Sequence, residues 1–448
     1  MIIPISLYAN CYMRSFILNR GLPVLVLLLF FSHSSKAYSV LTHEAVVDAS
    51  WQKSIIPLLK EKYPMATDSE LRVAHSYAYG GCMMPDMGYF PFGSTYFTDL
   101  AHYVRTGDFV CALISEAQNL NEYAFALGAL SHYMADKYGH SLGTNHVVPL
   151  VYPKLKKEFG DIVTYEQNPI AHSRVEISFD VLQVARGNYA TQAYHDFIGF
   201  NVAKPVLERA FMKIYGQDIN VVFGNLDLAI STFRWSVKDL LPTLTRSAWV
   251  LKKDEIKKTN PSANSRNFRY RMHRRDYKLE FGKTHQKASF GDQILAFFIR
   301  ILPKVGPLKA LKFKDPGPQG EKLFIASFDS VLVKYAEALT ALNHGRIILN
   351  NVDYDTGKET SFGEYSLADL TYSDMLYELQ HNKFYDLTAP LKQNIVSFYS
   401  KADSTTNSKK YPVDWKKTNG ALVQVKSAQT IKIDSLKTAT GLNYKLQQ

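Results

Sequence analysis

The order of hydrophobic and polar positions indicates helices along nearly all of residues 38–250. Within 121–140, apolar side chains recur at spacings of three and four, the period of one helix face. A Thr-Asp-Ser run at 67–69 offers N-cap residues for a helix that we expect to end at the glycine pair 80–81. Further helices are expected at 171–189, 204–215 and 226–241, with loops at 80–93 and 143–153. No strand alternation of any length is present, so we predict an all-α domain of eight to ten helices.

A second helical segment is expected over residues 288–400, after a basic linker at 251–287. Its expected helices are 290–301, 322–343, 366–384 and 388–399. The apolar stretch 293–302 suits a buried helix or a helix that lies on a membrane surface. Residues 401–448 are rich in Lys, Ser and Thr, so we expect a poorly ordered tail.

Residues 1–37 have the pattern of a secretory signal peptide. Arg14 and Arg20 precede an apolar run at 22–31, and the small residues Ser35 and Ala37 mark a cleavage site. Ten apolar residues are too few to cross a hydrocarbon core of about 30 Å, which argues against an uncleaved anchor. We therefore expect cleavage after Ala37 and a soluble, exported protein that is periplasmic, secreted or peripheral on an outer surface.

Composition describes a folded globular protein, with 46% hydrophobic and 21% charged residues. Three cysteines exclude a disulfide-rich scaffold and a multi-cysteine zinc ribbon. Cys11 leaves with the signal peptide, and Cys82 and Cys111 can pair only if the fold brings them together.

The positive charge gathers in one window. The formal net charge of +11 falls to +8 without the first 37 residues, and residues 251–290 carry twelve Lys or Arg against four Asp or Glu. A solvated linker is the ordinary interpretation. Attraction to an anionic membrane surface or to nucleic acid is the alternative.

Histidines and acidic residues recur at spacings that suit metal binding. His132, Asp136 and His140 stand four residues apart, and each four-residue step turns a helix by only about 40°, so the three share one stripe. His172 and Glu176 repeat the spacing on a later helix. One such pair is usually a cap or a surface pair, but two in one domain favour a zinc site.

Three earlier residues complete an ordered set. They are His43 near the expected mature start, Asp86 in a turn-rich Pro-Asp loop, and His102. Each alone is more often structural, and Asp86 can be only an Asx-turn former. Together, the set resembles the zinc-dependent phospholipase C family and, in the same superfamily, the single-strand-specific nucleases, over about residues 38–250. The other histidines considered, His75, His195 and His273, match nothing in this pattern and are interpreted as structural.

The resemblance implies three zinc ions in a helical domain. Asp86, His102 and His132 would hold one zinc, and Asp136 would bridge it to a second, which the amino group and carbonyl of Tyr38 and the side chain of His43 complete; His140, His172 and Glu176 would hold the third. The chain departs from the family in two places. Tyr38 stands where members usually begin with Trp, and His140 follows Asp136 by four positions instead of six. His146 in the following loop is the alternative ligand, and His140 is preferred because it shares the stripe.

The resemblance also implies an activity. Zinc lowers the pKa of bound water toward about 7, and a phosphodiester suits a site that offsets charge on phosphate oxygens. We expect an exported phosphodiesterase of phospholipase C type that splits phospholipid into diacylglycerol and a phosphorylated head group. Asp86 would orient or deprotonate the attacking water, and Asp136 would bridge the metals.

Two alternatives stay open. One is a single-strand-specific zinc nuclease or 3'-nucleotidase, with single-stranded nucleic acid as substrate in place of phospholipid. Glu176, where the nucleases carry Asp, and the small number of cysteines favour the lipase. The other is a zinc-bearing surface or binding protein whose catalysis is weak or lost. No obligate protein partner is inferred.

Overall fold

The computed structural model describes residues 40–186, 199–237, 257, 313–402 and 413–433. The expected signal peptide, Tyr38, the basic linker apart from Lys257, and the expected helix 290–301 lie outside these ranges. Within them the regular elements are helices, and extended pairing is limited to isolated bridges between Val352 and Glu359 and between Thr388 and Ile431. The all-α prediction is confirmed.

The N-terminal part supplies the helices around the candidate ligands. They are α3 (Val40–Ser50), η2 (Trp51–Ile55), α4 (Ile56–Lys62), α5 (Asp68–Met83), η3 (Met84–Tyr89), α6 (Thr95–Tyr103), α7 (Thr106–Glu116), α8 (Leu120–Gly139), η4 (His140–Thr144), α9 (Asn145–Val151), α10 (Pro153–Phe159), α11 (Pro169–Arg186), α13 (Lys204–Tyr215), α14 (Ile219–Phe223) and α15 (Leu226–Trp235). The expected loop 143–153 is therefore largely helical. Pro153 occupies the first turn of α10, where a missing backbone N–H has no cost.

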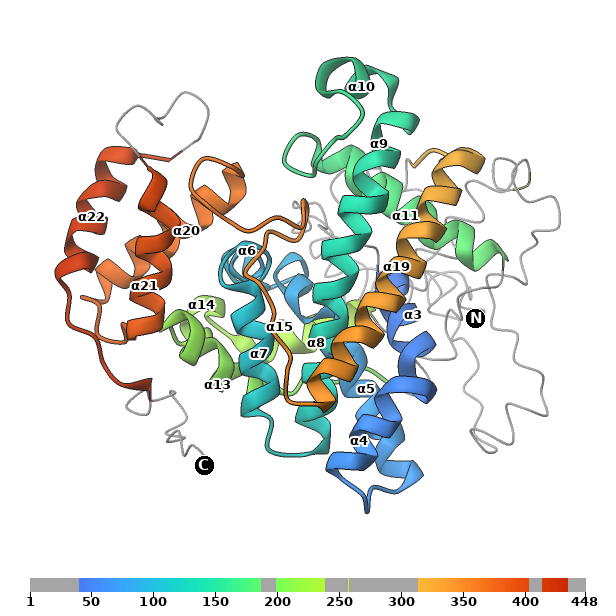
Figure 1. Cartoon of the computed structure of the whole chain (residues 1–448), viewed down its shortest axis with the longest axis horizontal. Helices are drawn as coiled ribbons and strands as arrows, with labels where there is room; N and C mark the ends of the chain where they lie inside the picture. Colours follow the sequence, from blue (N-terminus) through green and yellow to red (C-terminus); the bar gives the residue numbers. More distant parts are fainter. Residues whose placement is uncertain (1–39, 187–198, 238–256, 258–312, 403–412, 434–448) are drawn as a thin grey trace, which may run out of the picture.

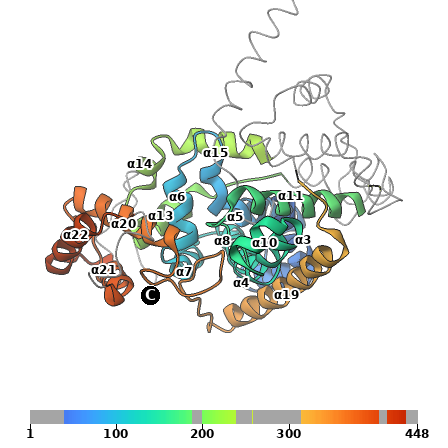
Figure 2. The ribbon, with the colours of Figure 1, turned by 90° about the horizontal axis from the view of Figure 1, so that it is seen from above.

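Helix α8 lies at the centre of the fold, with α3, α5, α7 and α19 (Gly317–Asn343) packed around it (Figures 1 and 2). Its side chains are buried around the whole circumference from Glu122 to Asp136, because Ala, Phe, Leu and Gly occupy most positions. The polar residues on this helix are therefore held in a rigid interior. The stripe that carries His132 and Asp136 faces that interior.

The glycine pair 80–81 does not end α5, which continues to Met83. The reason is packing. A methyl group at Gly81 would lie 1.9 Å from the carbonyl oxygen of Phe125, and one at Gly128 would lie 2.0 Å from the carbonyl oxygen of Ala78. Helices α5 and α8 thus approach backbone to backbone, which brings the residues that follow α5 close to the stripe on α8.

Gly128→Ala is expected to lower the free energy of unfolding by about 1–3 kcal/mol, because the added methyl must displace backbone. Gly420→Ala on α22 (Trp415–Ser427) is the control. No atom lies within 4 Å of a methyl placed there, so helix propensity should raise stability by about 0.5–1 kcal/mol. Chemical denaturation of both variants checks the pair, and equal effects would refute the close-packing argument.

The C-terminal segment is part of the same core. Helix α19 lies along α8, where the Tyr335 hydroxyl donates to the carbonyl of Leu127 at 2.9 Å. Phe324 stacks on Phe179 of α11 with ring centroids 4.2 Å apart. One continuous hydrophobic cluster runs through the described residues from Val40 to Val425.

The last of the described helices form a group at one end of the molecule (Figures 1 and 2): α20 (Ser366–His381), α21 (Ala389–Phe398), η7 (Tyr399–Lys401) and α22. The expectation of a poorly ordered tail is wrong for α22. Its buried Leu422 and Val425 pack on the core, because a short helix needs only a narrow apolar stripe to dock in a mostly polar sequence.

Between α19 and α20, residues 344–365 form a connecting segment that crosses α7 and α8 (Figure 1). Thr106 exchanges hydrogen bonds with the backbone of Val352, at 2.8 and 3.0 Å. The Tyr133 hydroxyl donates to the carbonyl of Asn350 at 2.9 Å, and the backbone N–H of Tyr354 donates to the carbonyl of His102 at 3.2 Å. The connecting segment is therefore fixed across the helices that carry the candidate ligands.

Two further expectations bear on cysteines and membranes. Cys82 is buried, Cys111 is partly buried, and both are free thiols, so they do not pair. Among the described helices, none combines the length and apolar character that a membrane span needs.

Candidate metal centre

The residues singled out from sequence spacing converge, apart from Tyr38, which lies outside the described ranges. They come from α3, η3, α6, α8, the start of η4, and α11. Their ligand-capable atoms form three groups, each within 4.8 Å: His43, His132 and Asp136; Asp86, His102 and His132; His140, His172 and Glu176. Every member is buried, none more than 3% exposed.

Asp136 lies between the groups. Its Oδ1 is 3.2 Å from His43 Nε2 and 3.9 Å from His140 Nε2. Its Oδ2 is 3.1 Å from His132 Nε2 and 3.5 Å from His102 Nε2. The two oxygens of one carboxylate thus face different sets of nitrogen atoms, an arrangement that suits a bridging ligand.

The backbone fixes which nitrogen two of the histidines present. His102 Nδ1 donates to the carbonyl of Thr98 at 2.8 Å, and His132 Nδ1 donates to the carbonyl of Cys82 at 2.7 Å. The proton of each neutral ring is thereby held on Nδ1, so Nε2 offers its lone pair to the interior. Asp86 Oδ1 lies 3.4 Å from this Nε2 of His102.

The third group joins the end of α8 to α11. His172 Nδ1 is 2.6 Å from Glu176 Oε1, and His140 Nε2 is 3.8 Å from the same oxygen. The helical path continues from α8 into η4, which carries His140 to this place. His146, the alternative, is partly buried in α9 and belongs to none of the three groups found among the described residues.

The pKa values of the buried carboxyl and imidazole groups depend on burial and on the neighbouring charges. Burial alone would raise the pKa of Asp136, but the neighbouring His132 and His43 hold it well below its usual range. Burial lowers the pKa of His102, yet Asp136 and Asp86 outweigh this effect and raise the pKa to about 9. Burial raises the pKa of Glu176 well above its ordinary value.

The donor set fits zinc. Both carboxylate oxygens of Asp86 and of Asp136, together with Nε2 of His102 and His132, are buried and form no hydrogen bond within the described part of the chain. Orphaned buried polar atoms are costly unless a further group satisfies them. Imidazole nitrogen and carboxylate oxygen are the ligands that zinc takes in catalytic sites.

The sequence-based interpretation missed two residues beside the third group. Asp355 Oδ1, in the connecting segment, lies 3.3 Å from His140 Nδ1 and 3.5 Å from His172 Nε2. Asn145 Oδ1 accepts from His172 Nε2 at 2.7 Å. No helical spacing links either residue to the predicted ligands, because one lies in a non-helical segment and the other joins through a tertiary contact. Only the fold reveals them.

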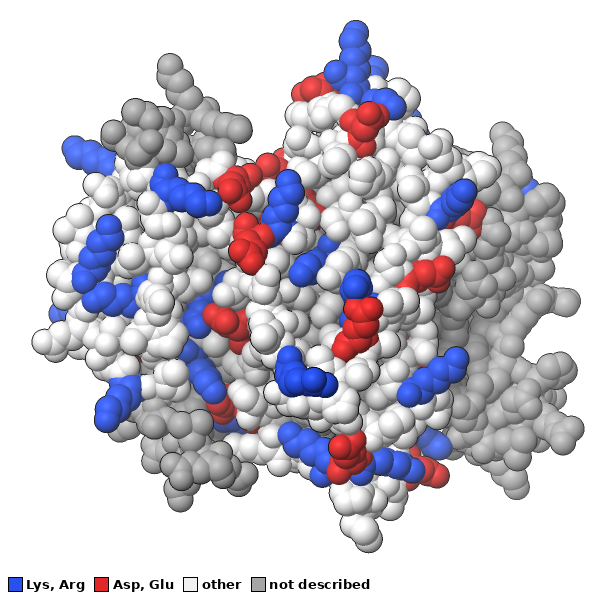
Figure 3. Space-filling model, viewed as in Figure 1, with Lys and Arg blue, Asp and Glu red and all other residues white. Residues whose placement is uncertain are grey.

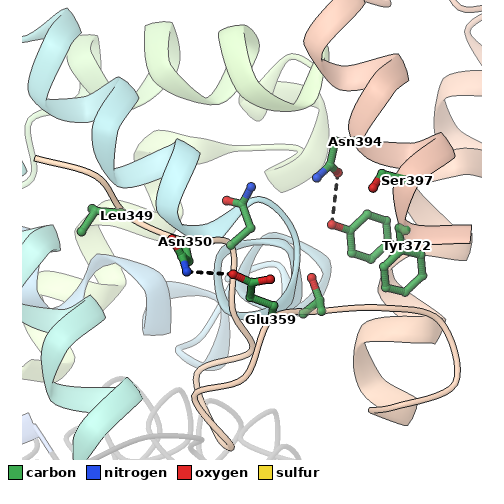
Figure 4. Close-up of a pocket in the computed structure, with 9 residues that line it drawn as sticks. Leu349, Asn350, Glu359, Tyr372, Asn394 and Ser397 are labelled. Carbon is green, nitrogen blue, oxygen red and sulfur yellow. Dashed lines mark hydrogen bonds between the residues drawn. The ribbon is translucent and has the colours of Figure 1, made fainter. Parts of the chain in front are cut away.

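A separate hollow of about 340 Å³ opens between the connecting segment and helices α20 and α21 (Figure 4). Asn350 donates to Glu359 at 2.7 Å on one side, and Tyr372 donates to Asn394 at 3.1 Å on the other. None of the metal-centre residues lines this hollow. It is therefore distinct from the cluster described above.

Comparison with known proteins gives one match. No curated protein and no solved structure matches the chain. Residues 42–225 match the family described as zinc dependent phospholipase C, a range that includes every member of the three groups and excludes both Tyr38 and Asp355. The match covers less than half of the chain, so the similarity to the zinc-dependent phospholipase C family is established for the domain of residues 42–225.

Proposed function

We propose that the chain is an exported phosphodiesterase that binds three zinc ions and hydrolyses phospholipids to diacylglycerol and a phosphorylated head group. The observation that carries this proposal is the convergence of three buried His and carboxylate groups, inside the family-matched domain, around the single carboxylate of Asp136. Pairs of His and acidic residues that occurred by chance would lie on the surface, and they would not meet around one carboxylate.

The proposed ligands follow the groups. Asp86, His102, His132 and Asp136 would hold one zinc; His43 and Asp136 would contribute to the second; His140, His172 and Glu176 would hold the third. Tyr38 would complete the second site with its amino group and carbonyl, which requires removal of the signal peptide. Asp180 supports this assignment because it accepts from the Leu41 N–H at 3.1 Å and the Thr42 hydroxyl at 2.7 Å, and so fixes the start of α3 two residues beyond Tyr38.

The reaction adds water across a phosphodiester. When bound, zinc acts as a Lewis acid that lowers the pKa of water and offsets charge on the phosphate oxygens. We assign Asp86 to accept the proton from the attacking water, because it is an acidic member of the centre and is held on the short η3 helix. A bond forms between the water oxygen and phosphorus, the bond between phosphorus and the glycerol oxygen breaks, that oxygen takes up a proton, and the head group leaves as a phosphomonoester.

Three observations favour a lipid over a nucleic acid. The segments that follow Asp86 and His140 each expose a large apolar side chain, Phe92 and Leu142. The tyrosines whose rings approach His102, such as Tyr89 and Tyr354, are buried and offer no open surface for stacking bases. On the face shown in Figure 3, basic and acidic side chains are interspersed, whereas a nucleic-acid groove gathers basic ones.

Phosphorus NMR tests the proposal. Vesicles of phosphatidylcholine, phosphatidylethanolamine and phosphatidylserine are incubated with zinc-loaded protein that begins at Tyr38, and a single-stranded oligonucleotide is digested in parallel. New phosphomonoester signals that a chelator abolishes and added zinc restores are the expected result, and they identify the head group. Unchanged lipid with a cleaved oligonucleotide would replace the proposal with the nuclease, and no metal-dependent cleavage of either would favour a non-catalytic zinc protein.

A further inference from the structure

The third metal group has a second carboxylate beside it, supplied from outside the family-matched range. Asp355 belongs to the connecting segment and is buried, with its Oδ1 within 3.5 Å of a nitrogen of both His140 and His172. Residues 42–225 therefore do not contain the whole surroundings of this group.

Asp355 and Glu176 face opposite sides of the same two rings. Glu176 Oε1 lies toward His140 Nε2 and His172 Nδ1, at 3.8 and 2.6 Å. Asp355 Oδ1 lies toward the remaining nitrogens, His140 Nδ1 and His172 Nε2. A neutral ring carries a proton on one nitrogen and a lone pair on the other, so a carboxylate behind one nitrogen aims the other nitrogen at the metal.

The carboxylate of Asp355 is itself fixed on both oxygens. Its Oδ2 accepts from the backbone N–H of Tyr165 and from the hydroxyl of Tyr365, each at 2.8 Å. Its backbone carbonyl accepts from the Asn145 amide at 2.8 Å, and the same amide accepts from His172. The connecting segment, α9 and α11 are thus joined through one polar network behind the two imidazoles.

We propose that Asp355 is a positioning residue of the third zinc site, which the C-terminal segment therefore completes. It accepts a hydrogen bond from Nδ1–H of His140 and, together with Asn145, keeps the proton of His172 on Nε2. His140 Nε2 and His172 Nδ1 are then the nitrogens that would meet the metal beside Glu176. Its negative charge also adds to that of Glu176 and balances a divalent ion. The inference rests on the zinc-binding part of the proposed function and not on the choice of substrate.

Zinc binding by the full mature chain tests this role without an activity assay. Asp355→Asn is expected to weaken one zinc site by about 10–100-fold, the usual effect of removing such a supporting carboxylate. At a buffered free-zinc concentration that just saturates wild type, elemental analysis should find one zinc fewer per chain, and a colorimetric chelator should extract that zinc faster.

Asp353→Asn is the matched control. Asp353 lies two residues away in the same segment, is equally buried, and bonds the backbone and hydroxyl of Thr356 instead of a histidine. The inference requires Asp353→Asn to keep the zinc content of wild type. Equal loss in both variants would mean that only the shape of the segment matters, and unchanged zinc content in Asp355→Asn would overturn the assignment outright.

A milder variant keeps the test decisive if Asp355→Asn does not fold. Tyr365→Phe removes only the hydroxyl that bonds Asp355 Oδ2, and should speed chelator extraction of one zinc by about three- to tenfold, below the effect of losing the carboxylate itself. Extraction at the wild-type rate would contradict the inference. Wild-type protein that binds no zinc would instead defeat the proposed function, which separates the two failures.

Discussion

Replacing Asp136 with alanine is expected to lower phosphodiester hydrolysis by at least about a thousandfold and to reduce the zinc content. Oδ1 of Asp136 faces His43, and Oδ2 faces both His132 and His102, so its loss removes the carboxylate that would join two of the metal groups. Metal ions contribute several kcal/mol of charge stabilisation in such reactions, and about 4 kcal/mol corresponds to a thousandfold in rate. Turnover of a soluble phosphodiester and elemental analysis measure the two effects.

The comparison must separate loss of the metal from loss of the fold. Asp136→Asn keeps the shape of the side chain and one of its oxygens, so its hydrolysis rate and zinc content should lie between those of Asp136→Ala and wild type. Asp48→Asn is the matched control, since Asp48 pairs with His75 at 3.1 Å in the same domain but belongs to no metal group. Hydrolysis that survives in Asp136→Ala at the wild-type rate would sink the tri-zinc assignment, because no bridging ligand would be left.

Part of the candidate ligand set could be predicted because its spacing obeys helix geometry. His132 and Asp136 share a turn of α8, and His172 and Glu176 share a turn of α11, whereas His43, Asp86 and His102 were expected only from the resemblance of the ordered set to a known family. Local periodicity is enough to place such residues on one face. The structure then shows how the packing of six elements brings these residues together.

Other features could not be predicted, since they depend on contacts between distant segments. The glycines of α5 look like a helix end, but they mark the close crossing with α8 that only the packed structure contains. Asp355 lies in a non-helical segment, and nothing in its sequence neighbourhood points to His140. The sequence alone also does not decide between His140 and the alternative ligand His146, because the position of His146 depends on the course of α9.

The appended C-terminal segment therefore has a structural relation to the metal centre that composition does not reveal. Helix α19 packs on α8, and the connecting segment then crosses α7 and α8 before α20 begins. The hydrogen bond between the Tyr354 N–H and the His102 carbonyl fixes this crossing at the group of Asp86, His102 and His132, as Asp355 does at the group that contains His140. Stability of the segment and occupancy of the metal sites should therefore be linked.

Removal of zinc is expected to lower the melting temperature by on the order of 10 °C for each site that is emptied. A ligand at about a thousand times its Kd stabilises the folded state by about 4 kcal/mol per site, and each kcal/mol shifts the melting temperature of a large domain by about 2–4 °C. The metal-free centre also leaves the buried carboxylate oxygens of Asp86 and Asp136 without a hydrogen bond from the described residues, so the cost of their desolvation adds to the loss.

Differential scanning calorimetry before and after dialysis against a chelator measures the shift, and elemental analysis confirms that the metal has left. Zinc should restore the melting temperature, whereas magnesium at the same concentration should not, because imidazole-rich sites disfavour a cation that prefers oxygen ligands. A chain that loses its zinc and still melts at the original temperature would show that the His and carboxylate pairs stabilise the fold by themselves. The buried cluster would then be an internal ion-pair network, and the link between the connecting segment and metal occupancy would be lost with it.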